Sequence, residues 1–328
     1  MVSQELLVQA ADSFGFDVKT LVFISNSCNE VYRFTLHNQP YILRLSAKPH
    51  AYNAQIKAEV DWVCYLAQNG VRASLPVHTS DGQLTAVCRH QEQCFIATAF
   101  HMAPGRFFDK SNPQLWGPPI FRKWGEAMGQ MHLLTKSYPA ADVAERRADW
   151  GKWHINNPNL NQGRYLILLD KLKALEDSIS NLPKDAASYG LIHNDFHPYN
   201  FHIDNGEITV FDFDDSIYGW YALDIAIAAT HAVWWGSPAE DRHSKHEFAE
   251  QFLMEFLTGY SKHNVLTYNW IQQIPMFMDY RNICSYFWWL GGWDGDESRL
   301  SEAQQAAIAH AVHLIQSGQS FDGCDIKL

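Results

Sequence analysis

The chain has 328 residues, of which 47% are hydrophobic and 19% charged, and its formal net charge is −11. This composition excludes a disordered or fibrous protein, and the length allows two domains, each with a core of its own. Because no run of Lys or Arg offsets the acidic charge locally, we do not expect a surface for nucleic acid.

The first residues predict a helix followed by strands. Residues 3–16 have amphipathic helical spacing and open with Ser3, a residue type that favours the start of a helix. Three short segments rich in β-branched and aromatic residues follow, separated by polar turns. We therefore expect strands at residues 18–24, 30–36 and 41–46.

A second helix is expected after these strands. Residues 51–69 carry apolar side chains at helical spacing, and Gly70 closes the segment. Strands are expected again between residues 73 and 101. Pro104 then lies in a break in regular structure, so we expect a small β-rich N-terminal lobe over residues 1–102.

Residues 103–328 are mostly helical by pattern and form the expected larger C-terminal lobe. Apolar spacing predicts helices that include residues 125–137 and 165–180. One feature differs from this pattern. Residues 201–213 consist of two short apolar runs joined by Asn205-Gly206, the strongest two-residue signal for a β-hairpin.

Nothing in the sequence predicts export or a membrane span. The N-terminus lacks the basic start and unbroken apolar core of an export signal. The six cysteines form no CxxC pair, which favours reduced thiols. The most apolar window, residues 217–235, contains Asp224 and His231 and is expected to be a buried helix. We expect a cytoplasmic protein without a membrane partner, and the sequence leaves its oligomeric state open.

The segment LIHNDFHPYN, residues 191–200, carries the residue types that phosphoryl transfer needs. That reaction requires a carboxylate to orient the attacking hydroxyl and oxygen ligands for magnesium. Asp195 is the candidate base. Asn200 follows five positions later and Asp212 lies at the end of the expected hairpin, so we expect these two residues to hold the metal.

The two histidines of this segment suggest a second hypothesis, a metal site. His193 and His197 form a single HxxxH pair on a loop, and the sequence supplies no further ligands at a spacing typical of zinc. We therefore expect both histidines to brace the loop by hydrogen bonding, with His202 in a similar role or on the hairpin surface.

The motifs together resemble a known family. HNDFHPYN, followed by VFDFDDSIYGWYALDIA, is similar to the catalytic signature of the aminoglycoside phosphotransferase and choline kinase family, which is related to the protein kinases. The resemblance extends upstream to SNSCNEVYRF, YILRLS, Glu59 and GEAMGQMHLLT, and it covers residues 20 to 235.

The resemblance implies an α+β, bilobal protein-kinase-like fold that uses ATP and Mg²⁺. It implies that Asp195 is the catalytic residue, that Asn200 and Asp212 bind the metal, and that Arg44 and Glu59 serve the phosphates. The backbone at residues 101–103 is expected to meet adenine.

Three residues or segments depart from the family pattern. Arg44 stands where most kinases have lysine, which replaces a point charge by a planar fork. The expected nucleotide loop, residues 25–34, contains no glycine. Asn194 replaces the usual glycine before Asp195, and asparagine tolerates unusual backbone angles better than most residues.

The acceptor is expected to be a small molecule with a hydroxyl, such as an amino alcohol, a homoserine-like amino acid, a sugar or an aminoglycoside. Residues 279–298 combine aromatic and acidic side chains, which suit a cationic group, although Trp288, Trp289 and Trp293 are also typical packing residues. Two alternatives stay open. DDSIYGWYALD has the spacing of stress-response protein Ser/Thr kinases, and the glycine-free loop is compatible with a catalytically silent nucleotide-binding scaffold.

Overall fold

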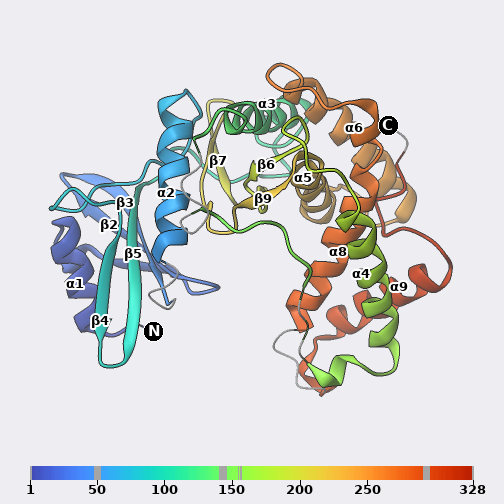
Figure 1. Cartoon of the computed structure of the whole chain (residues 1–328), viewed down its shortest axis with the longest axis horizontal. Helices are drawn as coiled ribbons and strands as arrows, with labels where there is room; N and C mark the ends of the chain where they lie inside the picture. The colour runs from blue at the N-terminus through green and yellow to red at the C-terminus, as the bar shows by residue number, and fades with distance from the viewer. Residues whose placement is uncertain are drawn as a thin grey trace. The chain divides into compact units, whose positions relative to one another are not determined.

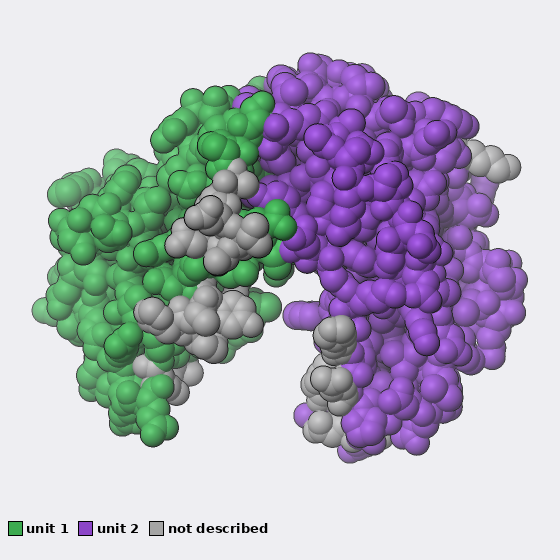
Figure 2. Space-filling view, viewed as in Figure 1, with its two compact units in different colours: residues 1–107, 137–148, 199–217 green, residues 108–136, 149–198, 218–328 purple. Residues whose placement is uncertain are grey.

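The computed structural model (Figure 1) describes residues 2–47, 53–139, 146–153, 155, 157–290 and 296–326. The chain forms two compact units, which Figure 2 distinguishes by colour. Unit 1 comprises residues 1–107, 137–148 and 199–217, and unit 2 comprises residues 108–136, 149–198 and 218–328. The expected α+β class, with a β-rich N-terminal part and a helical C-terminal part, is confirmed. The functional boundary at residue 102 stays a prediction.

Unit 1 is built on a five-stranded sheet in the order β1-β2-β3-β5-β4, in which neighbours pair antiparallel. The prediction for residues 18–24 was partly wrong, because Asp17 caps a 3₁₀ turn at Val18–Thr20 before the strand begins. Residues 73–85 were also expected to be extended, but they contribute only isolated bridges at Ala73 and Pro76. The strands are β1 (Val22–Ser25), β2 (Glu30–Leu36), β3 (Gln39–Ser46), β4 (Ala86–His90) and β5 (Gln93–His101).

Two helices cover opposite faces of this sheet (Figure 1). Successive residues of a strand point to opposite faces, so Leu43 and Leu45 pack with helix α1 (Gln4–Phe14), whereas Arg44 meets helix α2 (Asn53–Gln68). Helix α1 begins after Ser3, whose hydroxyl accepts a hydrogen bond from the N–H of Leu6, as predicted.

The predicted hairpin is confirmed in unit 1. Strands β7 (Phe201–Asp204) and β8 (Glu207–Val210) pair antiparallel around Asn205 and Gly206, which both have positive φ, 51° and 81°. The backbone of β7 also bonds to Arg106, and that of β8 bonds to residues 72 and 74. Neighbouring segments therefore hold the hairpin from both sides.

Unit 2 is mostly helical, with one short β-pair of β6 (Tyr189–Ile192) and β9 (Ile217–Trp220). The predicted helices at residues 125–137 and 165–180 correspond to α3 and α4. The helices are α3 (Pro118–Thr135), α4 (Arg164–Ser180), α5 (Tyr221–Gly236), α6 (Arg242–Tyr260), α7 (Tyr268–Ile271), α8 (Ile274–Leu290) and α9 (Glu302–Gln316), with 3₁₀ turns at Pro158–Leu160 and Glu297–Arg299.

Helices α3 and α6 pack closely because both carry glycines at their contact. A β-carbon at Gly125 would overlap the carbonyl oxygen of Phe256, and one at Gly259 would overlap that of Arg122. A β-carbon at Gly129 would lie 2.5 Å from the carbonyl oxygen of Tyr260. The glycines of GEAMGQM therefore allow the two backbones to touch, and this contact fixes α3 against the core of unit 2.

Helix α5 is buried along nearly its whole length. The buried helix expected at residues 217–235 is confirmed from Tyr221 onward, whereas residues 217–220 form strand β9. Its apolar residues form the centre of unit 2, and the buried Asp224 is at its first turn. Within the described ranges, no helix has both the length and the apolar character needed to cross a bilayer. All six cysteines are free thiols.

Candidate active site

Arg44 and Glu59 form a buried pair in unit 1. The two Nη atoms of Arg44 donate to the two carboxylate oxygens of Glu59, each at 2.8 Å. Burial opposes the charged guanidinium, but the charge of Glu59 outweighs it and raises the pKa of Arg44 above its ordinary value. Because the contact is bidentate, it fixes the orientation of the planar fork.

The hairpin brings Asn200 and Asp212 to the same end of its ladder. Phe201 is the partner of Val210, and just beyond this pair the N–H of Phe211 donates to the carbonyl of Asn200 at 3.0 Å. Asp212 is the next residue, with a positive φ of 65° that turns the chain out of the strand. The two expected metal ligands therefore lie together in unit 1.

Asp212 also lies close to the Arg44–Glu59 pair. Its Oδ1 is 3.7 Å from Nη1 of Arg44. Although the side chain of Asp212 is 52% exposed, partial desolvation and the neighbouring acids Glu59, Asp214 and Asp215 raise its pKa above the ordinary value, against the opposing charge of Arg44. Such a carboxylate, set among other acids, favours a nearby cation.

Two further contacts hold the segment after Asp212. Asp214 accepts a hydrogen bond from the side-chain amide of Asn29 at 2.9 Å, which ties it to the expected nucleotide loop. Arg147, a residue that the sequence analysis did not single out, is buried and donates to the backbone carbonyls of Asp214 and Ser216. No local pattern points to Arg147, because its partners lie 67 and 69 residues away.

The carbonyls of the expected hinge have partners within unit 1. His101 accepts from the hydroxyl of Ser74 at 2.6 Å. Ala103 accepts from Nδ1 of His202 at 2.9 Å, so His202 braces this segment instead of lying on the hairpin surface. Contact of residues 101–103 with adenine stays a prediction.

The loop that carries Asp195 is held by Asp224, which is fully buried in unit 2. The carboxylate of Asp224 accepts from the backbone N–H of His193 at 3.1 Å and from that of Asn194 at 2.8 Å. Asn194 has φ of 65°, in the left-handed region that the sequence analysis expected it to tolerate. Asp224 therefore structures the loop.

A buried network supports Asp224 in turn. Nε2 of His132 lies 3.0 Å from Asp224 Oδ2, and Nδ1 of His132 lies 2.9 Å from the hydroxyl of Tyr260. Burial lowers the pKa of His132 against the opposing effect of Asp224. A neutral ring with its proton on Nε2 donates to Asp224 and accepts from Tyr260.

Asp195 has partners on both of its oxygens. Nη2 of Arg281, on α8, donates to Oδ1 at 2.5 Å, and Nε2 of His197 lies 3.2 Å from Oδ2. Burial raises the pKa of Asp195, but the hydrogen bond with His197 and the charge of Arg281 outweigh it and hold the pKa well below its ordinary value. The carboxylate is therefore ionised at neutral pH. The sequence analysis did not single out Arg281.

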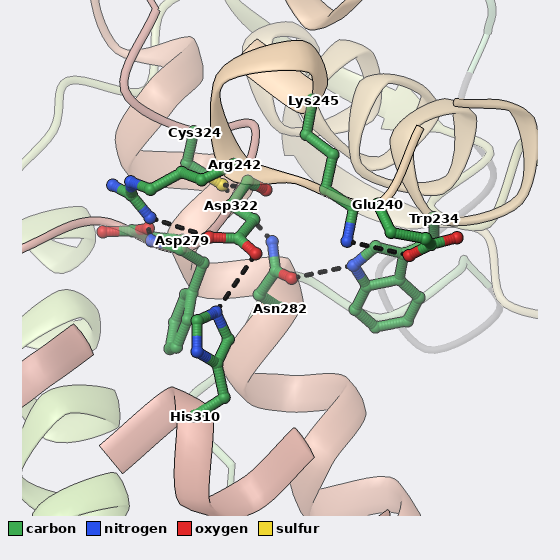
Figure 3. Close-up of polar contacts among 10 residues, drawn as sticks. Trp234, Glu240, Arg242, Lys245, Asp279, Asn282, His310, Asp322 and Cys324 are labelled. Carbon is green, nitrogen blue, oxygen red and sulfur yellow. Dashed lines mark hydrogen bonds and ion pairs between the residues drawn. The ribbon is translucent and has the colours of Figure 1, made fainter. Parts of the chain in front are cut away.

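A cavity of about 470 Å³ lies in unit 2 among α5, α6, α8 and α9. Trp234, Trp235 and Trp289 line it and are half-buried. Several of its polar groups are paired, as Figure 3 shows: Asp322 meets Arg242 and His310, Asn282 accepts from the indole N–H of Trp234, and Lys245 meets Glu240. The cavity therefore presents mainly aromatic surface.

Trp235 connects this cavity to the loop of Asp195. Its ring stacks on His231 at 4.8 Å and meets the ring of His197 edge-on at 5.0 Å. Of the C-terminal tryptophans considered in the sequence, Trp289 lines the cavity, Trp288 is exposed and Trp293 lies outside the described residues.

Comparison with known proteins identifies the class. The chain matches the phosphotransferase enzyme family over residues 20–264 and belongs to that family. It is therefore a phosphotransferase with an alcohol group as acceptor, a small-molecule kinase, as the resemblance of its motifs predicted.

Individual relatives agree with this assignment. The chain is 32% identical to amicoumacin kinase of Bacillus subtilis (strain 168) over 290 residues, which cover 86% of this chain and 83% of that protein. It is also similar to the structure of amicoumacin kinase hAmiN in complex with AMP-PNP, Ca²⁺ and Ami, with 28% identity, a TM-score of 0.85 and coverage of 98% and 95% of the two chains. A microcompartment-associated aminopropanol kinase shares the fold, with 19% identity, a TM-score of 0.75 and coverage of 97% and 98%.

Proposed function

We propose that the protein transfers the γ-phosphoryl group of ATP to a hydroxyl of a small molecule and requires Mg²⁺. The observation that carries this proposal is that the hairpin pairs Asn200 with Phe211, the residue before Asp212, so both expected metal ligands lie at the same end of its ladder. The likeness to a kinase solved with AMP-PNP and Ca²⁺ supports a nucleotide triphosphate and a divalent cation as its cofactors.

Asn200 and Asp212 fit Mg²⁺ by their chemistry. They offer amide and carboxylate oxygens, and Mg²⁺ is commonly bound by one or two such side chains together with phosphate oxygens and water. Among the described residues, no group of three or more His, Cys, Asp or Glu forms a metal site on its own, which is consistent with a cation completed by the nucleotide. When bound, it neutralises charge on the phosphates.

Arg44 is proposed to contact the phosphates and Glu59 to orient Arg44. The bidentate contact holds the guanidinium in one plane, so its position is set before the nucleotide arrives. A guanidinium supplies a cation to phosphate oxygens as a lysine does, with a fixed geometry in addition. Arg44 therefore replaces the usual lysine without loss of charge.

Asp195 is proposed to orient the acceptor hydroxyl and receive its proton. The acceptor oxygen bonds to the γ-phosphorus while the bond from that phosphorus to its bridging oxygen breaks, ADP leaves, and the hydroxyl proton passes to Asp195. Because the pKa of Asp195 is held low, it is a weak base. It therefore acts mainly by orienting the hydroxyl, and the proton moves after the new bond has begun to form.

The acceptor is proposed to bind on unit 2, with its apolar part in the tryptophan-lined cavity. Trp235 links that cavity to His197 and hence to Asp195. Amicoumacin is the first acceptor to test, because the relative that is 32% identical is an amicoumacin kinase. A cationic group on the acceptor, which the aromatic and acidic residues of the sequence would suit, is compatible with aromatic walls.

The protein-kinase alternative has less support. Residues 217–223, between Asp212 and Asp224, form β9 and the first turn of α5. Only a short connection is left for an activation loop, which favours a small acceptor. The scaffold alternative is tested by measuring phosphoryl transfer and Mg-ATP binding, as described next.

The experiment is transfer of labelled γ-phosphate from Mg-ATP to amicoumacin, amino alcohols, hydroxy amino acids, sugars, aminoglycosides and a generic protein. Asp195→Asn should lower transfer by about a hundredfold or more while ATP still binds. Asp170→Asn, at an exposed position on α4, is the matched control. Full activity of Asp195→Asn would exclude the proposed role, and Mg-ATP binding by the wild type without transfer to any of these acceptors would favour the scaffold.

A further inference from the structure

The Asp195–Arg281 pair is only partly buried. The side chain of Asp195 is 18% exposed and that of Arg281 is 24% exposed. Neither group is saturated by the other, because a carboxylate oxygen accepts more than one hydrogen bond and a guanidinium has five N–H groups.

This pair presents a hydrogen-bond acceptor and a donor next to each other. The nearest nitrogen and oxygen of the two side chains are 2.5 Å apart. His197 meets the other oxygen of Asp195 at 3.2 Å, so the plane of the carboxylate is fixed from both ends. A ligand that offers a donor and an acceptor on neighbouring atoms therefore matches the pair.

The charges of Asp195 and Arg281 are opposite and offset each other. Two histidines lie nearby: His197 contacts Asp195, and His231 is buried, which lowers its pKa well below 6.5 and leaves it neutral at pH 7. A cation on the carbon next to a hydroxyl bound by Asp195 would lie within about 6 Å of the guanidinium, where like charges repel. An ammonium there has no net electrostatic attraction.

Resting on the proposed function, we propose that the Asp195–Arg281 pair selects acceptors in which the reacting hydroxyl stands next to a carbonyl group. The hydroxyl donates to Asp195 while the carbonyl oxygen accepts from Arg281. Such two-point recognition by arginine adds geometric selectivity to binding energy. An acceptor with an ammonium on the neighbouring carbon bonds to Asp195 alone, and Arg281 repels it. Arg281 is then the residue that determines this specificity.

The test compares two acceptors of the same skeleton. Lactamide carries a carbonyl next to its hydroxyl, and 1-amino-2-propanol carries an aminomethyl group at the same position. The measured quantity is the ratio of their kcat/KM values with Mg-ATP, for the wild type, Arg281→Gln and Arg281→Lys. A ratio cancels any general loss of folded enzyme. Arg299→Gln, at an exposed position outside the site, is the matched control.

The wild type and the Arg299→Gln control should prefer lactamide by about tenfold or more, since that corresponds to one modest hydrogen bond or repulsion. Arg281→Gln should remove or invert this preference, and Arg281→Lys should retain part of it because the charge stays and the fork is lost. A wild-type preference for 1-amino-2-propanol, or a ratio unchanged in Arg281→Gln, would overturn the proposal. So would the absence of transfer to both compounds by an enzyme that phosphorylates another acceptor. If the protein neither binds nor consumes Mg-ATP, the proposed function itself fails.

Discussion

The carboxylate of Asp224 accepts a hydrogen bond from the backbone N–H of Asn194 at 2.8 Å and thereby fixes the residue that precedes Asp195. Asn194 needs this support because its φ of 65° is costly for most residues with a β-carbon. The backbone angle of Asn194 is costly, and the buried carboxylate of Asp224 holds it in place. The orientation of Asp195, the next residue, depends on both.

The stability of Asn194 variants should depend on how well the new residue tolerates a positive φ. Asn194→Gly should be tolerated, with a change in the free energy of unfolding of less than about 1 kcal/mol, because glycine adopts positive φ without strain. Asn194→Val should destabilise by about 2 kcal/mol or more, since a β-branched residue is strained there. Urea denaturation measures both. Equal stability of the two variants would show that the positive φ is not retained in solution.

Replacement of Gly125 by alanine, the smallest possible increase in side-chain size, should destabilise the protein. Gly125→Ala places a methyl group against the carbonyl of Phe256 on α6, so the two helices must separate, at a cost of about 3 kcal/mol or more despite the better helix propensity of alanine. The control is Gly151→Ala, where a β-carbon would meet nothing within 4 Å. Thermal unfolding should show a clear loss for the first variant and little change for the second.

Local features of the fold could be predicted from sequence because their signals lie in consecutive residues. Ser3 before an amphipathic run predicted the start of α1, and Asn205-Gly206 predicted the hairpin that brings Asn200 and Asp212 to the same end of its ladder. Where a competing local signal went unrecognised, the prediction was wrong, as at Val18–Thr20, which Asp17 caps as a 3₁₀ turn.

The partners of the site residues could not be predicted in the same way. Arg281 meets Asp195 from 86 positions away, and no local pattern distinguishes it from a surface arginine. The glycines of α3 have low helix propensity, and only the close approach of α6 explains them. A joint role of Arg44 and Glu59 at the phosphates was implied only by the family resemblance, which supplied tertiary information that spacing alone lacks.

Two substitutions of Arg44, to Met and to Lys, should differ in their effects on stability and on ATP binding. Arg44→Met leaves the carboxylate of Glu59 buried without its partner and should destabilise by about 3 kcal/mol or more. Arg44→Lys keeps the charge but not the bidentate contact, so it should lose less stability and still bind Mg-ATP more tightly than Arg44→Met does. Urea denaturation and calorimetric titration with Mg-ATP measure the two effects. Equal ATP affinity in both variants would argue against contact between Arg44 and the phosphates.

His231 should make the protein less stable in acid. Its pKa in the folded state lies well below 6.5, mainly because the ring is buried, and Nδ1 has no partner among the described residues. Above pH 6.5 the ring is neutral in both the folded and the unfolded state and contributes no pH dependence. Below pH 6.5 the ring binds a proton in the unfolded state but not in the folded state. The free energy of unfolding therefore decreases as the pH is lowered, until the pKa of the folded state is reached.

Replacement of His231 should therefore make the free energy of unfolding less dependent on pH below pH 6.5. His231→Phe keeps an aromatic ring to stack on Trp235 and cannot bind a proton, so from pH 7 to pH 5 it should lose about 2 kcal/mol less free energy of unfolding than the wild type. Urea titrations at a series of pH values measure the slope. His243→Gln, which removes an exposed histidine, should follow the wild type. A slope in His231→Phe equal to that of the wild type would mean that His231 is protonated in the folded protein, and the Asp195–Arg281 pair would then have a second cation beside it.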